Sequence, residues 1–178
     1  MITLDIPQAN ALETVRRVVK SVSLGANTLE AIADLTAFSS RHTSYRLHAA
    51  RILGLLHSEG DRVSLTPRGE RLLDTDAYSS EERTVFCSAI ESSAVIQVLA
   101  PDLLTLCPPN QEELASRLFQ NSRLSKETAE RRAGTLISWR KYVLGQTLPE
   151  QKTDKPPRSK ARKPTLPSQA RGEQLSLF

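Results

Sequence analysis

Residues 28–73, TLEAIADLTAFSSRHTSYRLHAARILGLLHSEGDRVSLTPRGERLL, decide the fold of this 178-residue chain. Their pattern predicts a short apolar helix, a turn, a longer basic helix, two short strands and a further helix. Thr28 is a suitable N-cap for the first helix. Gly54 can adopt the left-handed conformation that ends the second helix. Thr66 and Pro67 are expected to open the last helix of the stretch.

The longer helix has an apolar stripe at helical spacing, made by Thr43, Leu47, Ala50 and Gly54. A stripe that packs on the core turns the other side chains toward solvent. In the N-terminal half of the helix, the outward side chains are Arg41, His42, Tyr45 and Arg46. Residues at such positions are the ones that a recognition helix offers to base edges.

A β-hairpin is predicted directly after this helix. Leu55 and Leu56 return the chain to the core, and the turn Ser58-Glu59-Gly60-Asp61 precedes the alternating residues 62–65. A glycine-containing turn between short alternating runs is a hairpin signal. The hairpin is therefore expected from Leu55 to Leu65, and helix, turn, helix, hairpin is the order of a winged helix-turn-helix.

The sequences GLL at residues 54–56 and LTPRG at residues 65–69 resemble the ending of bacterial winged-helix domains of the MarR type, over about a quarter of the chain. Ala50 departs from the family, which usually has a leucine there. The resemblance implies that the helix before Gly54 enters the major groove and that the wing contacts the backbone or the minor groove. The residues it assigns to DNA are Arg41, His42, Tyr45, Arg46 and Arg62.

The charge of the longer helix favours nucleic acid as its partner. Between Ser40 and Ser58 there are three arginines, three histidines and no acidic residue. Exposed helices usually mix the two signs, so this asymmetry indicates a phosphate-binding surface. Winged helices also serve as protein–protein modules, in which case the basic face would only be solvated.

A second helical unit is predicted after residue 76. Ser79 and Glu82 have the spacing of a capping box, and Asn110 with Glu113 repeats that spacing. The apolar side of the helix after Asn110 is expected to comprise Leu114, Ala115, Leu118 and Phe119.

A long helix N-capped by Ser125 and ending before Gly145 completes the second unit. A helix, a short turn and a longer basic helix repeat the helix-turn-helix plan. The long helix offers Arg131 and Arg132 to DNA, although it also carries Glu127 and Glu130. Packing or dimerisation is the alternative role of this unit, and Trp139 is expected in the core.

The composition changes at residue 147. Residues 147–178 contain seven basic and three acidic residues, and five of the ten prolines of the chain lie between residues 147 and 173. Residues 147–173 have almost no apolar side chains with which to build a core, so they are expected to form a disordered basic linker. Such a linker is either merely solvated or makes loose, salt-sensitive contacts with phosphates.

An apolar pentapeptide, QLSLF at residues 174–178, follows this linker. It resembles the pentapeptide by which bacterial polymerases and repair proteins bind the β sliding clamp. The resemblance implies hydrogen bonds from Gln174 at the mouth of a pocket, Leu175 over a shallow site, and Leu177 and Phe178 in a deep apolar cleft, with Ser176 between them. The alternative is a segment that folds back onto the preceding domain.

No enzyme is predicted. Pro101-Asp102 and Glu150-Gln151-Lys152 spell a PD-(D/E)xK nuclease motif, but no strands are predicted that would bring the carboxylates together on one metal. The three histidines and two cysteines share no metal-ligand spacing, so neither a metal site nor a cofactor is expected. The cysteines are expected to be reduced thiols of a cytoplasmic, nucleoid-associated protein. Neither an export signal nor a membrane span is predicted.

These observations predict a mainly α-helical protein in four parts. A winged helix-turn-helix with a two-strand wing occupies residues 1–76, a helix-turn-helix-like unit residues 77–146, the linker residues 147–173, and the clamp-binding peptide residues 174–178. The expected function is that of a DNA-binding accessory protein recruited to the clamp, in replication, repair, restriction or phage defence. The alternatives are a transcriptional regulator, whose winged helix would act as a homodimer, and a plasmid or phage replication initiator.

Overall fold

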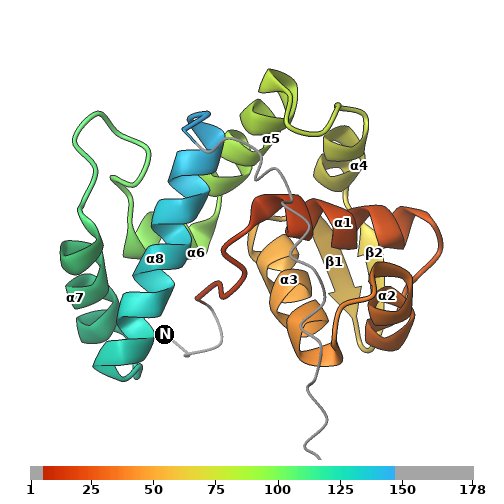
Figure 1. Ribbon diagram of the computed structural model, residues 1–178, viewed down its shortest axis with the longest axis horizontal. Helices are drawn as coiled ribbons and strands as arrows, with labels where there is room; N and C mark the ends of the chain where they lie inside the picture. Colours follow the sequence, from red (N-terminus) through yellow and green to blue (C-terminus); the bar gives the residue numbers. More distant parts are fainter. Residues whose placement is uncertain (1–5, 147–178) are drawn as a thin grey trace, which may run out of the picture.

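The computed structural model describes residues 6–146. This part of the chain forms eight α-helices and one antiparallel sheet of two strands (Figure 1). The elements are, in order, α1 Leu12–Ser23, α2 Leu29–Thr36, α3 Ser40–Ile52, β1 Leu56–Glu59, β2 Arg62–Leu65, α4 Pro67–Leu73, α5 Ser80–Glu91, α6 Ala94–Leu99, α7 Gln111–Asn121 and α8 Lys126–Val143. The mainly helical fold with a two-strand wing is thus confirmed.

Helices α2 and α3 form a helix-turn-helix, and hydroxyl side chains cap both of them. The Thr28 hydroxyl accepts a hydrogen bond from the backbone N–H of Ala31 (3.3 Å), which confirms the predicted cap of α2. Ser39 caps α3 in the same way. Between the two helices, Ala37 adopts the left-handed conformation with φ 57°. This residue makes the turn that sets the direction of α3.

The hairpin predicted between Leu55 and Leu65 is also confirmed. Strands β1 and β2 pair antiparallel, from Leu56 opposite Leu65 to Glu59 opposite Arg62. Gly60, with φ 59°, lies in the turn, where a left-handed conformation favours glycine. In each strand one residue is buried while its neighbours are more exposed, so the hairpin covers the core with one face.

The connections around the hairpin lock the winged helix together. Gly54 has φ 64°, as predicted for the end of α3. The Thr66 hydroxyl donates to the Gly54 carbonyl (2.7 Å) and accepts from the N–H of Gly69 (3.1 Å), so one side chain joins the end of α3 to the start of α4. A β-carbon on Gly69 would come closer than 3.0 Å to the Leu55 carbonyl oxygen. The GLL and LTPRG segments are therefore two halves of one contact.

The second unit consists of α5 to α8. Asn110 and Glu113 form the predicted capping box at the start of α7, and Ser125 caps α8. Phe119 was expected on the apolar side of α7, but half of it (51%) is exposed. The Ser79–Glu82 capping box is wrong in one half, because Ser79 accepts from the N–H of Glu82 while the Glu82 carboxylate accepts from the N–H of Tyr78 instead.

The carboxylate of Glu82 joins three helices. It is completely buried. It accepts hydrogen bonds from the guanidinium of Arg16 on α1 (3.2 Å) and from the hydroxyl of Tyr142 on α8 (2.6 Å). Burial and the hydrogen bond to Glu82 raise the pKa of Tyr142 well above its ordinary value. The contact fixes the winged helix and the second unit to one another.

The segment before α1 makes a second connection between the two units. The indole N–H of Trp139 on α8 donates to the carbonyl of Ala9 (2.7 Å), and the Trp139 side chain is completely buried, as predicted. Figure 1 shows this segment running from α8 to the winged helix. The domain boundary predicted at residue 76 falls between α4 and α5, yet the buried apolar residues on both sides of it form one cluster.

Candidate nucleic-acid interface

Helix α3 presents the positive end of its backbone dipole without a neighbouring acid. The Ser39 hydroxyl accepts from the N–H of His42 (3.4 Å), and the first turn contains no acidic residue. The inner side of the helix is held by Thr43 and Leu47, which are buried. A helix N-terminus with unneutralised N–H groups attracts phosphate.

Arg41 and Tyr45 form a pair one turn apart on the outer face of α3. The Arg41 Nε donates to the Tyr45 hydroxyl (2.6 Å), and the guanidinium carbon lies 5.5 Å from the centre of the Tyr45 ring. Arg41 and His42 are both exposed, and Tyr45 is half-buried. The ring thus orients the guanidinium, while the remaining N–H groups of Arg41 stay available to a ligand.

Arg46 lies differently from the expectation that it points outward. Its guanidinium carbon lies 4.1 Å from the centre of the Phe38 ring, in the turn between α2 and α3, and its Nη1 donates to the His42 carbonyl (2.9 Å). Arg17 of α1 lies 4.5 Å from the same ring. Burial, and then the charge of Arg17, lower the pKa of Arg46. Arg46 therefore packs the turn that positions α3.

Arg62 is at the start of β2 and is exposed. It pairs with Glu59 across the hairpin, so an acidic residue stands directly opposite it. The next residue, Val63, is buried and donates its N–H to the Asn27 carbonyl (2.9 Å), which fixes the hairpin against the loop after α1. Arg62 therefore projects from a supported strand at the tip of the wing.

The two arginines predicted on α8 separate into a surface residue and a buried one. Arg131 is exposed and donates to the hydroxyl of Thr128 (3.3 Å). Arg132 is only 8% exposed, and its Nη1 donates to the Ile6 carbonyl (3.0 Å). Burial lowers the pKa of Arg132, and the neighbouring Tyr45 opposes this effect. Arg132 therefore does not lie on the surface as expected, because its guanidinium anchors the segment before α1.

The N-terminal ends of α3 and α8 lie toward one edge of the molecule (Figure 1). In Figure 1, α3 and α8 both begin at the lower edge, and the β1–β2 turn lies at that edge as well. A nucleic acid lying along this edge would meet the N-terminal ends of both helices and the wing.

Two predicted segments lie outside the described residues 6–146. These are the basic segment 147–173 and the clamp peptide made by Gln174, Leu175, Ser176, Leu177 and Phe178. In the described range, no helix is long and apolar enough to cross a membrane. The same range contains no group of three or more histidine, cysteine, aspartate or glutamate side chains that could hold a metal ion.

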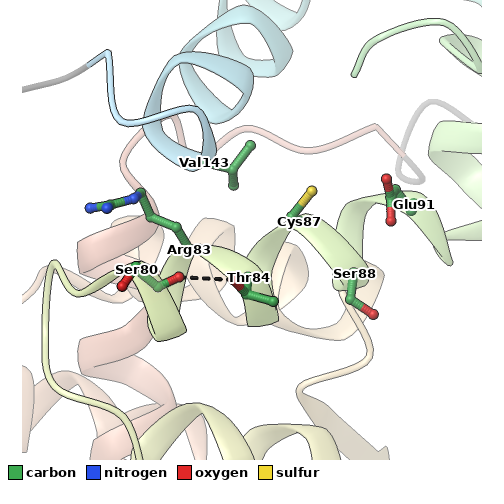
Figure 2. A pocket seen from close by; sticks show the side chains of 7 residues that line it. All are labelled: Ser80, Arg83, Thr84, Cys87, Ser88, Glu91 and Val143. Carbon is green, nitrogen blue, oxygen red and sulfur yellow. Dashed lines mark hydrogen bonds between the residues drawn. The ribbon is translucent and has the colours of Figure 1, made fainter. Parts of the chain in front are cut away.

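A cleft of about 280 Å³ lies between α5 and the end of α8 (Figure 2). Figure 2 shows Cys87 of α5 and Val143 of α8 among the side chains that line the cleft. The Thr84 hydroxyl donates to the Ser80 carbonyl (2.9 Å). Burial, followed by the charge of Glu91, raises the pKa of the Cys87 thiol. A nucleophilic cysteine requires a lowered pKa. The described residues that line this cleft therefore provide no activated thiol.

Sequence reasoning passed over one further feature of the interface. Arg51 and His57 are exposed on α3 and β1, and they line a cleft between these two elements. The charge asymmetry between Ser40 and Ser58 included both residues, but only the N-terminal half of the helix was assigned to DNA. Which side chains share a cleft depends on how β1 packs against α3, and a periodic pattern does not contain that contact.

Residues 15–148 match the family described as "Domain of unknown function (DUF7226)". The matched range begins in α1 and extends past the end of α8, so it includes both helical units and the wing. No curated protein and no solved structure matches the chain. Because the match covers well over half of its residues, the chain belongs to the DUF7226 family.

Proposed function

We propose that this protein is a DNA-binding accessory protein that is recruited to the bacterial β sliding clamp and acts in replication, repair, restriction or phage defence. The observation that carries the DNA-binding half is the outer face of α3. Its first turn has no acidic residue, and both Arg41 and His42 are exposed there. This combination of fixed dipole and side-chain charge favours a polyanion over a neutral protein surface.

In the proposed complex, the N-terminal half of α3 enters the major groove. Arg41, supported by Tyr45, donates to base edges or phosphates, and Arg62 reaches the backbone from the wing. Arg131 of α8 adds a contact beside the groove. Arg46 supports the helix-turn-helix from behind and makes no primary contact with DNA.

The clamp half of the proposal is carried by the sequence QLSLF at residues 174–178. Leu177 and Phe178 would fill an apolar cleft on the clamp, and Gln174 would set the register through hydrogen bonds. A weak peptide contact and a modest DNA contact in one chain raise each other's effective concentration on clamp-loaded DNA. Recruitment would thus need neither contact to be tight on its own.

Binding to the purified β clamp of the same organism tests the recruitment. Surface plasmon resonance should give a dissociation constant on the order of micromolar for the full chain. Changing Leu177 and Phe178 to alanine should abolish this binding, because most of the buried apolar area would be lost. Leu166→Ala is the matched control, since it removes a leucine from the preceding segment and should leave clamp binding intact.

Duplex binding is measured on the same proteins by fluorescence anisotropy. The Leu177→Ala/Phe178→Ala variant should bind DNA as the wild type does. If the wild type shows no clamp binding at roughly tens of micromolar, recruitment is wrong and a winged-helix transcriptional regulator explains α3 better. If the wild type binds no duplex, the DNA-binding half is wrong.

A further inference from the structure

A cleft of about 370 Å³ lies between the C-terminal half of α3 and strand β1. Helix α3 contributes His48, Arg51 and Ile52, and β1 contributes Leu56, His57 and Ser58. Leu56 is buried and belongs to the apolar core, whereas Arg51 and His57 are exposed. The cleft therefore has an apolar base and cationic or N–H-bearing walls that come from two different elements.

The side chains that line the cleft are suited to an anion. They include one guanidinium, two imidazoles and one hydroxyl, and no carboxylate. In the described part of the chain, the Arg51 and His57 side chains take part in no hydrogen bond and no ion pair. The hydroxyl oxygen of Ser58 is buried and has no hydrogen-bond partner in the described part of the chain. Such a group is stabilised when a ligand accepts its hydrogen bond.

The Arg51 side chain does not cap the C-terminus of α3. A basic residue near a helix C-terminus commonly neutralises the last carbonyl groups. Here the N–H groups of Gly54 and Leu55 already donate to the carbonyls of Arg51 and Ala50 (both 2.9 Å). The guanidinium of Arg68 donates to the Leu53 carbonyl (3.1 Å). These carbonyls at the end of α3 thus have donors other than the Arg51 side chain.

The acidic residues of the hairpin do not occupy the cleft. Glu59 and Asp61 are exposed beyond Ser58, and neither lines it. Glu59 stands opposite Arg62 at the far end of the strands. The positive potential within the cleft is therefore not cancelled by a carboxylate in its wall.

The position of the cleft relative to Arg41 suggests which anion it holds. Ten residues separate Arg41 from Arg51, which corresponds to about 15 Å along a helix axis. The major groove of B-DNA is about 12 Å wide. A helix whose N-terminal half lies in the groove therefore carries its other half to one of the phosphate backbones that border the groove.

We propose that the cleft between α3 and β1 is a phosphate-binding site, and that it holds a backbone phosphodiester of the duplex whose major groove receives the N-terminal half of α3. Arg51 and His57 donate to the phosphate oxygens from opposite walls, and the Ser58 hydroxyl donates from below. The proposal rests on the proposed DNA-binding function and deepens it. Because the contact is to the backbone, it contributes affinity that does not depend on the base sequence.

Salt titrations of duplex binding by the full chain test the site. The variants are Arg51→Gln and His57→Val, singly and together, and Arg71→Gln on the exposed surface of α4 is the matched control. The slope of log affinity against log salt should fall in magnitude by about 0.9 for one lost phosphate contact. Affinity should fall roughly tenfold at fixed salt. Arg71→Gln should change neither quantity, and all variants should unfold at the wild-type temperature.

A duplex carrying one neutral methylphosphonate at a time identifies the phosphate. One linkage should weaken wild-type binding and leave the Arg51→Gln/His57→Val variant unaffected, because the two changes remove the same contact. Calorimetry with inorganic phosphate alone tests the other source of the same chemistry. Saturable binding of inorganic phosphate that is lost in the variant, without such a linkage, would assign the cleft to a free phosphate and overturn the duplex assignment.

The outcomes separate this site from the proposed function. Wild-type protein that binds no duplex contradicts the proposed function itself. Wild-type protein that binds duplex with the same affinity and salt slope as the Arg51→Gln/His57→Val variant contradicts the cleft alone. A further result would also contradict it. If each methylphosphonate linkage reduced the duplex affinity of the wild type and of the variant by the same factor, no single phosphate would depend on Arg51 and His57.

Discussion

Gly69 of α4 lies so close to the carbonyl of Leu55 that a β-carbon on the glycine would approach the oxygen to less than 3.0 Å. The opposing atom belongs to the backbone, so no side chain can rotate to relieve the clash. The last helix of the winged helix is therefore seated directly against the segment that links α3 to the wing.

Gly69→Ala should lower the free energy of unfolding by about 1–3 kcal/mol or more, because the backbone must move to admit the methyl group. Gly134→Ala in α8 is the control, since its β-carbon would meet only the end of the Gln111 side chain at 3.4 Å. Alanine in a helix interior usually stabilises by about 0.5–1 kcal/mol relative to glycine. Urea denaturation measures both, and equal stabilities would contradict the close approach.

Arg41→Ala and Arg46→Ala should separate DNA contact from packing. Arg41→Ala should weaken duplex binding by about 1–3 kcal/mol and leave the melting temperature unchanged, because Arg41 is exposed. Arg46→Ala should lower the stability of the fold by about 1 kcal/mol, because its guanidinium packs on Phe38. Anisotropy and thermal unfolding of the same samples give both values. Loss of stability in Arg41→Ala alone would reverse these roles.

The neighbouring substitutions Arg131→Met and Arg132→Met should also separate DNA binding from stability. Arg132→Met should destabilise the protein by about 1–3 kcal/mol, since the Ile6 carbonyl loses its donor in a buried site. Arg131→Met should leave stability unchanged and reduce DNA affinity and its salt dependence. Calorimetric unfolding and salt titrations decide between them. A stable Arg132→Met protein with weakened DNA binding would restore Arg132 to the interface.

The Tyr142 hydroxyl should make stability depend on pH in the alkaline range. It donates to buried Glu82, and its pKa is raised in the folded state. Its stabilising contribution is therefore complete below the unfolded pKa of about 10 and declines as the pH rises above that value. Tyr142→Phe should be less stable than the wild type at pH 8, and the difference should narrow above about pH 10. Denaturation at several pH values measures the gap, and a constant gap to about pH 11 would contradict the raised pKa.

The local features of the fold could be predicted from the sequence because they depend on neighbours. Thr28 and Asn110 cap helices through residues three positions away, and Gly54 ends α3 through its own conformation. The hairpin followed from its turn and from the alternation of its strands. Each of these features needs only a few consecutive residues to specify it.

The features that sequence reasoning missed depend on distant parts of the chain. Arg132 looked like a surface residue by its type, but its partner lies 126 residues earlier. Glu82 has the spacing of a capping residue, but in the fold its carboxylate accepts hydrogen bonds from Arg16 and Tyr142, which lie on other helices. Arg46 was assigned outward from helical periodicity, which does not show that Phe38 lies beside it. The Arg51 and His57 cleft likewise depends on tertiary packing.

The hydrogen bond between the Arg132 guanidinium and the Ile6 carbonyl affects the order of folding during synthesis on the ribosome. A ribosome adds about 5–20 residues per second, and 126 residues separate the two partners. The segment before α1 therefore leaves the ribosome roughly 6–25 s before α8 exists to receive it. During that interval the winged helix can form its own hairpin and helix caps. The segment that precedes α1 has no partner to pack against until α8 is made. Its earliest described residues are thus among the last to find their native neighbours.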